Sequence, residues 1–131
     1  MTLLVIGVIS CGQGEPEPPS VEIVAPEEGA VLPDGNVRVV LRARAVQIAP
    51  VAAEREGTAH HHLFIDRDIT PLSDTIPAGV LGILHLGGGE TEFVLEELEP
   101  GAHRVIAVLA DRSHVPLSPP AADTVHFTVE R

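Results

Sequence analysis

The chain of 131 residues contains seven histidines, and three of them are consecutive, at His60, His61 and His62. Alternate side chains of a β-strand share a face, so His60 and His62 would point one way and His61 the other, beside Leu63 and Ile65. Two imidazoles at this spacing can reach one metal ion, because a zinc–nitrogen bond is only about 2.0–2.1 Å long. The triplet therefore predicts part of a metal site, which further ligands must complete.

His85 and His114 are the candidates for those further ligands. His85 lies just before the glycine-rich turn 87–89, and His114 follows Asp111 in a loop that reads Asp-Arg-Ser-His. A carboxylate near a loop histidine suits a metal ligand whose ring is oriented by an acceptor, so we expect Asp111 to orient one ligand and His61 to support the site. Imidazole ligands suit both copper and zinc, and their spacing alone does not choose between the two metals.

The same histidines have other interpretations. They can pack and hydrogen-bond inside a β-domain, where they would fasten the long loop 67–82 to the sheets, or form a pH-sensitive patch. Catalysis by a bound metal would require an open coordination position and a pocket. The sequence contains no Gly-x-Ser-x-Gly, HExxH or phosphate-loop motif. We therefore expect a binding or structural protein and not an enzyme.

The elements that must position these residues read as β-strands. Apolar and polar residues alternate in 21–25, 37–44, 91–96 and 125–130, the segment 60–66 is rich in β-formers, and 104–110 is apolar on both faces, as expected of a central strand. Gly and Pro clusters separate nearly all of these runs. The pattern predicts an all-β domain over residues 21–131, a single immunoglobulin-like antiparallel β-sandwich of about seven strands.

Two further histidines are expected to have no part in the site. The segment from Leu98 to Asp111, LEPGAHRVIAVLAD, resembles a strand-to-strand corner of bacterial immunoglobulin-like domains. The residue at the His103 position takes the part of the tyrosine corner there, hydrogen-bonding back to nearby backbone. His126 shares a face of the last predicted strand with Glu130 and is expected to be solvated.

The N-terminal residues predict export. The apolar run from Leu3 to Ser10 is far shorter than the roughly 20 residues of a membrane-spanning helix and is typical of a signal peptide. Val8-Ile9-Ser10-Cys11 resembles a bacterial lipobox, so residues 1–10 are expected to be a lipoprotein signal and Cys11 its lipidated residue. A plain secretory signal with a chance cysteine is the alternative. Residues 12–20 are rich in Pro, Gly and Glu and would form an extended tether.

Charge and composition restrict the partners. The net charge is −11, and the eight basic residues are all arginine, with no basic stretch. Such a chain lacks the electrostatic footprint for nucleic acid or anionic headgroups, so we expect no nucleic acid and membrane contact only through the lipid anchor. A hydrophobic content of 44% is too high for a disordered chain. We expect a periplasmic or cell-surface location.

Four motifs in order resemble the bacterial domain-of-unknown-function family 4399. The first, Gly57 to Asp66, is similar to the family's G-T-G-H-H-H-L-L-I-D, and the others are Ile76-Pro77, the segment 84–92, and 98–120 with its His-x-Pro and Pro-Pro. Departures from the family pattern are Ala59, Leu86, Gly88 and Glu90. The resemblance covers about residues 22–130. The resemblance implies an extracytoplasmic β-sandwich with a shared histidine site for copper or zinc, at the motif positions His60, His61, His62, His85 and His114.

Overall fold

The computed structural model describes residues 16–131, so the predicted signal peptide and Cys11 lie outside the described residues. No helix in this part of the chain is long and apolar enough to cross a membrane. The described residues form nine strands and one short 3₁₀ turn, in the order β1 (Ser20–Ala25), β2 (Ala30–Leu32), β3 (Val37–Arg44), β4 (Gln47–Ile48), η1 (Val51–Ala53), β5 (Thr58–Ile65), β6 (Ile83–Leu86), β7 (Glu92–Leu95), β8 (Gly101–Ala110) and β9 (Ala122–Val129).

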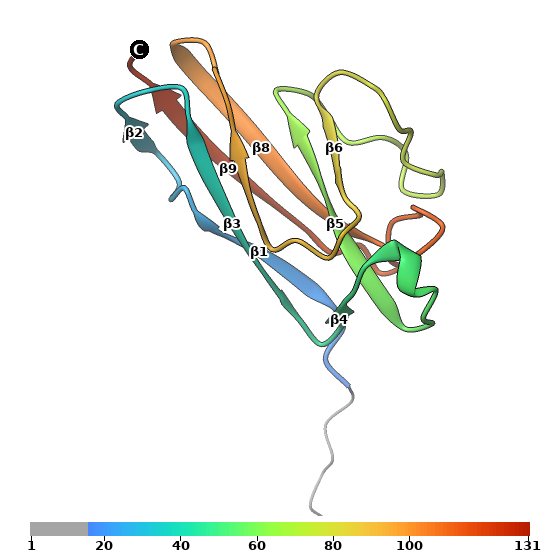
Figure 1. Ribbon diagram of the computed structural model, residues 1–131. Helices are drawn as coiled ribbons and strands as arrows, with labels where there is room; N and C mark the ends of the chain where they lie inside the picture. Colours follow the sequence, from blue (N-terminus) through green and yellow to red (C-terminus); the bar gives the residue numbers. More distant parts are fainter. Residues whose placement is uncertain (1–15) are drawn as a thin grey trace, which may run out of the picture.

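The strands form two sheets, one of three strands and one of six (Figure 1). The smaller sheet has the order β1-β3-β7, and the larger has the order β2-β9-β8-β5-β4, with β6 also paired to β5. This arrangement confirms the predicted immunoglobulin-like sandwich. The strand count is higher than the predicted seven because β2, β4 and β6 are too short to show alternation. The sandwich is also not wholly antiparallel, since β2 pairs with β9 and β4 pairs with β5 in parallel.

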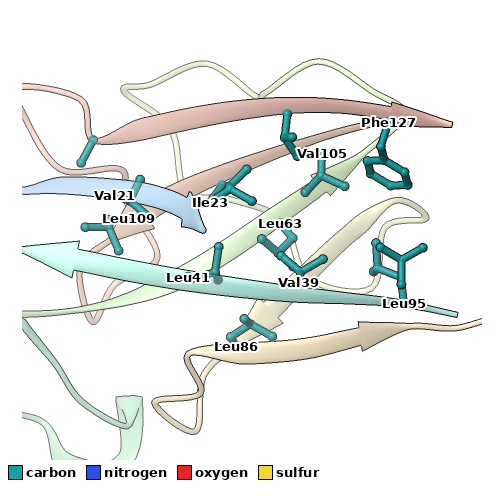
Figure 2. Close-up of a cluster of buried hydrophobic side chains, with 14 of the residues drawn as sticks. Val21, Ile23, Val39, Leu41, Leu63, Leu86, Leu95, Val105, Leu109 and Phe127 are labelled. Carbon is teal, nitrogen blue, oxygen red and sulfur yellow. The ribbon is translucent and has the colours of Figure 1, made fainter. Parts of the chain in front are cut away.

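Aliphatic side chains fill the space between the two sheets (Figure 2). On β3, Val37, Val39 and Leu41 are buried, while Arg38 and Arg42 point to solvent, as the alternation predicts. The core consists mostly of valine, leucine and isoleucine, with Phe127 from β9. β8 lies between β5 and β9, which confirms the central position predicted for 104–110.

A second apolar cluster lies on the opposite side of the larger sheet. Phe64 of β5 and Val108 of β8 pack there with Ile83, under the connection between β5 and β6. Ile76 in the middle of that connection is 1% exposed and belongs to this cluster. Segment 66–82 therefore covers one part of the outer face, and six consecutive residues of β5, from Ala59 to Phe64, are buried.

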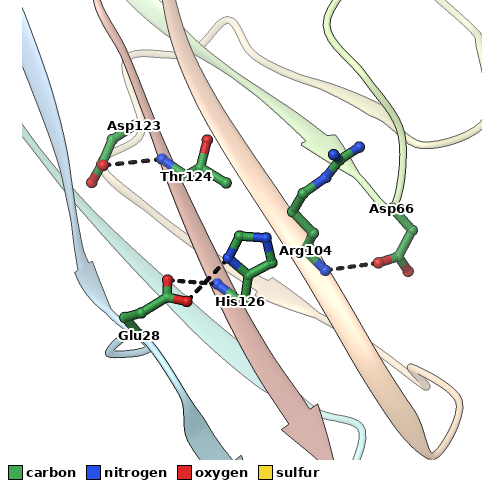
Figure 3. A network of polar contacts seen from close by, with 6 residues as sticks. All are labelled: Glu28, Asp66, Arg104, Asp123, Thr124 and His126. Atoms are coloured by element: carbon green, nitrogen blue, oxygen red, sulfur yellow. Dashed lines mark hydrogen bonds and ion pairs between the residues drawn. The ribbon is translucent and has the colours of Figure 1, made fainter.

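Polar contacts fix the connections near β8 and β9 (Figure 3). One carboxylate oxygen of Glu28 accepts a hydrogen bond from the backbone N–H of His126 at 2.9 Å. The other oxygen lies 3.0 Å from Nδ1 of the His126 ring. Asp66, where the chain leaves β5 with a φ of 54°, accepts the backbone N–H of Arg104 at 2.9 Å. The left-handed conformation at Asp66 turns segment 66–82 back over the sheet.

Candidate metal centre

Four histidines converge on the covered part of the larger sheet. One nitrogen from each ring lies within 4.8 Å of the corresponding nitrogens of the other rings. The side chains of His60 and His62 are 1% and 0% exposed, and the other two are half-buried. We call this group the histidine cluster: His60, His62, His85 and His114.

Strand register positions the rings that come from the sheet. β5 runs between β6 and β8 in antiparallel pairing, with His62 directly opposite His85 on one side and His60 opposite Ala110 on the other. Directly opposed residues of antiparallel strands have Cβ atoms only about 4.5–5.5 Å apart. The imidazoles of His62 and His85 therefore meet as a consequence of the pairing, and their ring centroids are 4.3 Å apart.

The remaining ring comes from a tight loop that follows β8. Asp111 begins this loop, and its carboxylate Oδ1 accepts hydrogen bonds from the backbone N–H groups of Ser113 at 2.8 Å and Val115 at 3.1 Å. His114 has a φ of 61°, a left-handed conformation that is uncommon for a residue with a side chain. The loop returns to the sheet where Pro116 bridges to Ala110. Asp111 thus positions His114 through the loop backbone.

Four of the six distances between the ring nitrogens that face one another are short. His60 Nε2 lies 3.1 Å from His114 Nδ1, and His62 Nε2 lies 3.0 Å from His85 Nδ1. His114 Nδ1 is also 3.3 Å from His85 Nδ1 and 3.4 Å from His62 Nε2. A neutral imidazole nitrogen either donates one hydrogen bond or accepts one, so His114 Nδ1 cannot satisfy its three neighbours by hydrogen bonding.

Two backbone groups of segment 66–82 form hydrogen bonds with members of the cluster. His85 Nε2 lies 3.0 Å from the carbonyl oxygen of Pro77, which only accepts, so this nitrogen carries the proton. The lone pair of His85 is then on Nδ1, which faces the cluster. The N–H of Ile76 donates to the carbonyl of His114 at 2.8 Å. Because both contacts use Ile76 and Pro77 main-chain atoms, no side-chain pattern in the sequence predicts them.

The environment keeps the rings neutral. Burial, followed by the neighbouring imidazoles His114 and His85, lowers the pKa of His60 from 6.5 to about 4. Burial, followed by His60 and His85, lowers the pKa of His62 to about 2. The pKa of His114 is also lowered, by burial and then by His85. Metal ions bind imidazole in its neutral form, so His60, His62 and His114 are in the protonation state that coordination requires.

His61 lies on the other face of β5, as the alternation predicts. Its side chain is 0% exposed, its Nδ1 lies 3.3 Å from the carbonyl oxygen of Glu90, and its Nε2 has no hydrogen-bond partner. Burial lowers its pKa. His61 is therefore separated from the cluster by the strand itself, and any support it gives to the site acts through the packing of β5.

His103 makes the hydrogen bond to nearby backbone that the sequence predicts. Its Nε2 donates to the carbonyl of Glu99 at 2.6 Å, four residues back along the chain, and its Nδ1 lies 2.7 Å from Asp66. Burial alone would lower the pKa of His103, but the hydrogen bonds to Glu99 and Asp66 outweigh it, and the pKa is raised. His126 is largely exposed, as expected, and pairs with Glu28.

An open groove of about 630 Å³ lies elsewhere, along β8 and β9, and is lined in part by Ala102, Arg104 and Phe127. Its charged side chains pair within the protein, as Arg104 does with Asp68 at 2.8 Å. It contains no member of the histidine cluster. The covered face of β5 is therefore the candidate site.

Comparison with known proteins identifies the family and the fold. The family model for Domain of unknown function (DUF4399) matches residues 39–130, a range that contains the whole cluster. No curated protein matches the chain. Among solved structures, a crystal structure of an engineered protein matches with a TM-score of 0.53 and 13% identity, over 88% of this chain and 21% of that one. The chain therefore spans about a fifth of the length of that engineered protein.

Two natural domains are also similar in structure. The fibronectin(III)-like modules of CbhA from Clostridium thermocellum match with a TM-score of 0.50 and 15% identity, over 84% of this chain and 96% of that one. The PKD domain of human KIAA0319 matches with a TM-score of 0.47 and 17% identity, over 86% and 80% of the two chains. At these identities the likeness describes the fold alone.

Proposed function

The chain belongs to the family Domain of unknown function (DUF4399), and since that description carries no activity, we propose from the site itself that the protein binds one transition-metal ion, copper or zinc, in the histidine cluster. The observation that carries this proposal is the convergence of one nitrogen from each of four imidazoles within 4.8 Å. Neutral imidazole nitrogens that face one another repel through their lone pairs unless a proton or a cation lies between them. One cation bound among them would satisfy the nitrogens that face one another.

The proposed role is binding and not catalysis. Catalytic zinc sites keep an open position beside three protein ligands, whereas structural sites use four. The cluster offers four ligands, and His60 and His62 are closed off from solvent. A metal bound by all of them would have no free position for a substrate or an activated water.

The proposed location is outside the cytoplasm, on a lipid anchor. The support for this part is the lipobox-like sequence that ends at Cys11 and the Pro- and Glu-rich residues that follow it. An anchor of this kind would hold the sandwich near a membrane surface of the cell envelope. Labelling with a radioactive fatty acid, in the wild type and in Cys11→Ala, tests it: label in the variant would contradict it.

Calorimetric titration with zinc(II) and copper(II) tests the metal proposal. The protein should be untagged and carry residues 16–131, which include both sheets in full. We expect one ion per chain with a micromolar or tighter dissociation constant, and loss of that binding in a His60→Ala/His62→Ala variant. His126→Ala, which removes an exposed imidazole outside the cluster, is the matched control. Binding that is equal in the cluster variant and the control would refute the proposal.

A structural role of the cluster is the second candidate function. It is favoured by the two backbone contacts that tie segment 66–82 to His85 and His114. In that case the histidines would fasten the covering segment, and no ion would be needed. Thermal unfolding separates the candidates, because a ligand that binds only the folded state adds stability that a chelator removes. A melting temperature unaffected by chelator, in protein purified with its native metal content, would favour the structural role.

A further inference from the structure

We infer that the cluster is a closed tetrahedral site built from two Nε2 and two Nδ1 atoms, and that it takes a d¹⁰ cation, zinc(II) or copper(I), in preference to copper(II). This inference rests on the proposed metal binding and specifies the class of ion. Zinc(II) and copper(I) both accept tetrahedral coordination by nitrogen, whereas copper(II) prefers tetragonal geometry.

Three of the four ligand nitrogens form a triangle whose edges indicate the coordination geometry. The nitrogens of His62, His85 and His114 are 3.0, 3.3 and 3.4 Å apart along the three edges. With metal–nitrogen bonds of about 2.0–2.1 Å, a tetrahedron has edges of about 3.3–3.4 Å. A square plane with the same bonds has adjacent nitrogens about 2.9 Å apart and opposite ones about 4.1 Å apart.

Any three corners of a square plane include one opposite pair, so one edge of the triangle would have to be about 4.1 Å long. No edge of the observed triangle approaches that length. The fourth nitrogen, of His60, is 3.1 Å from that of His114 and so continues the same close set. The triangle of His62, His85 and His114 therefore resembles one face of a tetrahedron and lacks the long diagonal that tetragonal copper(II) requires. The His60 nitrogen, within 4.8 Å of the other three, approaches this face as the fourth ligand.

The supports of the rings are rigid. His60 and His62 project from a strand that is hydrogen-bonded on both sides, to β6 and to β8. Phe64 and Val108 pack beside them at 1% exposure each. For any two of the three nitrogens to reach the separation of about 4.1 Å that a square plane requires, a strand or the loop of His114 would have to move. In affinity alone copper(II) exceeds zinc(II) at nitrogen sites, so geometry is the property by which a protein can reverse that order.

The ligand atoms are the ring nitrogens that face the cluster, and a contact outside the cluster supports the assignment for His85. The proton of His85 lies on Nε2, because that atom donates to Pro77, and the ring therefore coordinates through Nδ1. His114 likewise presents Nδ1, while His60 and His62 present Nε2. The set contains only imidazole nitrogens, without a carboxylate. Calcium and magnesium, which require oxygen ligands, are therefore not expected to bind.

Cobalt(II) substitution gives a direct readout of geometry. Tetrahedral cobalt(II) absorbs visible light much more strongly than octahedral cobalt(II), so we expect intense visible bands at one cobalt per chain. A closed site should give a spectrum that does not change when azide is added. His114→Ala should bind cobalt(II) with an open position, and its spectrum should change with azide. His126→Ala should behave as the wild type does.

Competition experiments identify the ion. We expect zinc(II) to displace cobalt(II), and copper(I), supplied anaerobically with ascorbate, to bind at the same stoichiometry. Copper(II), if it binds, should give an electron paramagnetic resonance spectrum distorted from the tetragonal type. Weak octahedral cobalt bands, or an ordinary tetragonal copper(II) spectrum with all four rings bound, would overturn the inference while metal binding itself stood. Absence of any bound metal would instead refute the proposed function.

Discussion

Acidification should destabilise the metal-free protein through His60 and His62. In the folded state their pKa values are lowered to about 4 and about 2, mainly by burial, against 6.5 in the unfolded chain. As the pH falls below 6.5, the unfolded chain gains protons that the folded protein does not accept, so folding stability decreases. The loss begins near pH 6.5 and continues until the pH reaches the folded-state values.

The size of the effect follows from the width of that window. At pH 5.0 an unfolded histidine is about 1.5 pH units below its pKa, and each unit is worth about 1.4 kcal/mol. Each ring therefore costs about 2 kcal/mol in free energy of unfolding, and both together cost about 4 kcal/mol. Small domains are stable by only about 5–15 kcal/mol, so the change would be large. The window lies above the range in which ordinary carboxyl groups titrate, about pH 4.

Urea unfolding of chelator-treated protein between pH 7.5 and 5.0, at constant ionic strength, measures this loss. A His62→Asn variant replaces one titrating ring with a neutral amide and should lose about 2 kcal/mol of the pH dependence, whatever its stability at pH 7.5. His126→Ala, which removes a histidine outside the cluster, is the matched control. Equal free energies of unfolding at pH 7.5 and 5.0 in the wild type, or full pH dependence in His62→Asn, would refute the reasoning.

Two further predictions concern the supports of the site and the corner of β8. Ile76→Ala should lower the free energy of unfolding by about 2–4 kcal/mol, because it leaves a cavity under segment 66–82, whereas Leu81→Ala, at a residue 96% exposed, should change it little; chemical denaturation compares them. The raised pKa of His103 stabilises the fold below pH 6.5, and this contribution is lost as the pH rises through the folded-state pKa. The stability difference between wild type and His103→Ala should therefore be larger at pH 5.5 than at pH 8.5, and an equal difference would contradict the contact with Asp66.

Alternation along the chain was sufficient to predict the fold and the faces of the histidine triplet. A period of two is a local property, so it shows in the sequence that His60 and His62 share a face and that His61 does not. The same period predicted β3, and the apolar character of both faces predicted the central position of β8. These features depend only on neighbouring residues and on the need to bury apolar side chains.

Pairing between distant segments was not predictable in the same way. The strand β6 has only four residues, Ile83–Leu86, and its sequence does not show which residue of β5 lies opposite His85. Register places His62 there, and a shift by one residue would turn His85 to the other face. The left-handed backbone at His114 and the carbonyl of Pro77 likewise leave no side-chain pattern. His85 and His114 could thus be proposed as ligands, but the geometry of the cluster required the structure.

The burial of β5 explains why the cluster is the most informative feature of this protein. A strand in a two-layer sandwich normally has one face on the core and one toward solvent. β5 is buried on both faces because segment 66–82 covers the outer one, and polar rings lie where apolar residues would give more stability. Nδ1 of His114 faces three ring nitrogens and can satisfy only one of them by hydrogen bonding. Buried polar groups cost free energy unless they are satisfied, so the fold carries a local cost at the cluster. Natural proteins place such exceptions at functional sites. A cation bound among the rings would offset that cost, and this links the stability of the sandwich to the occupancy of its site.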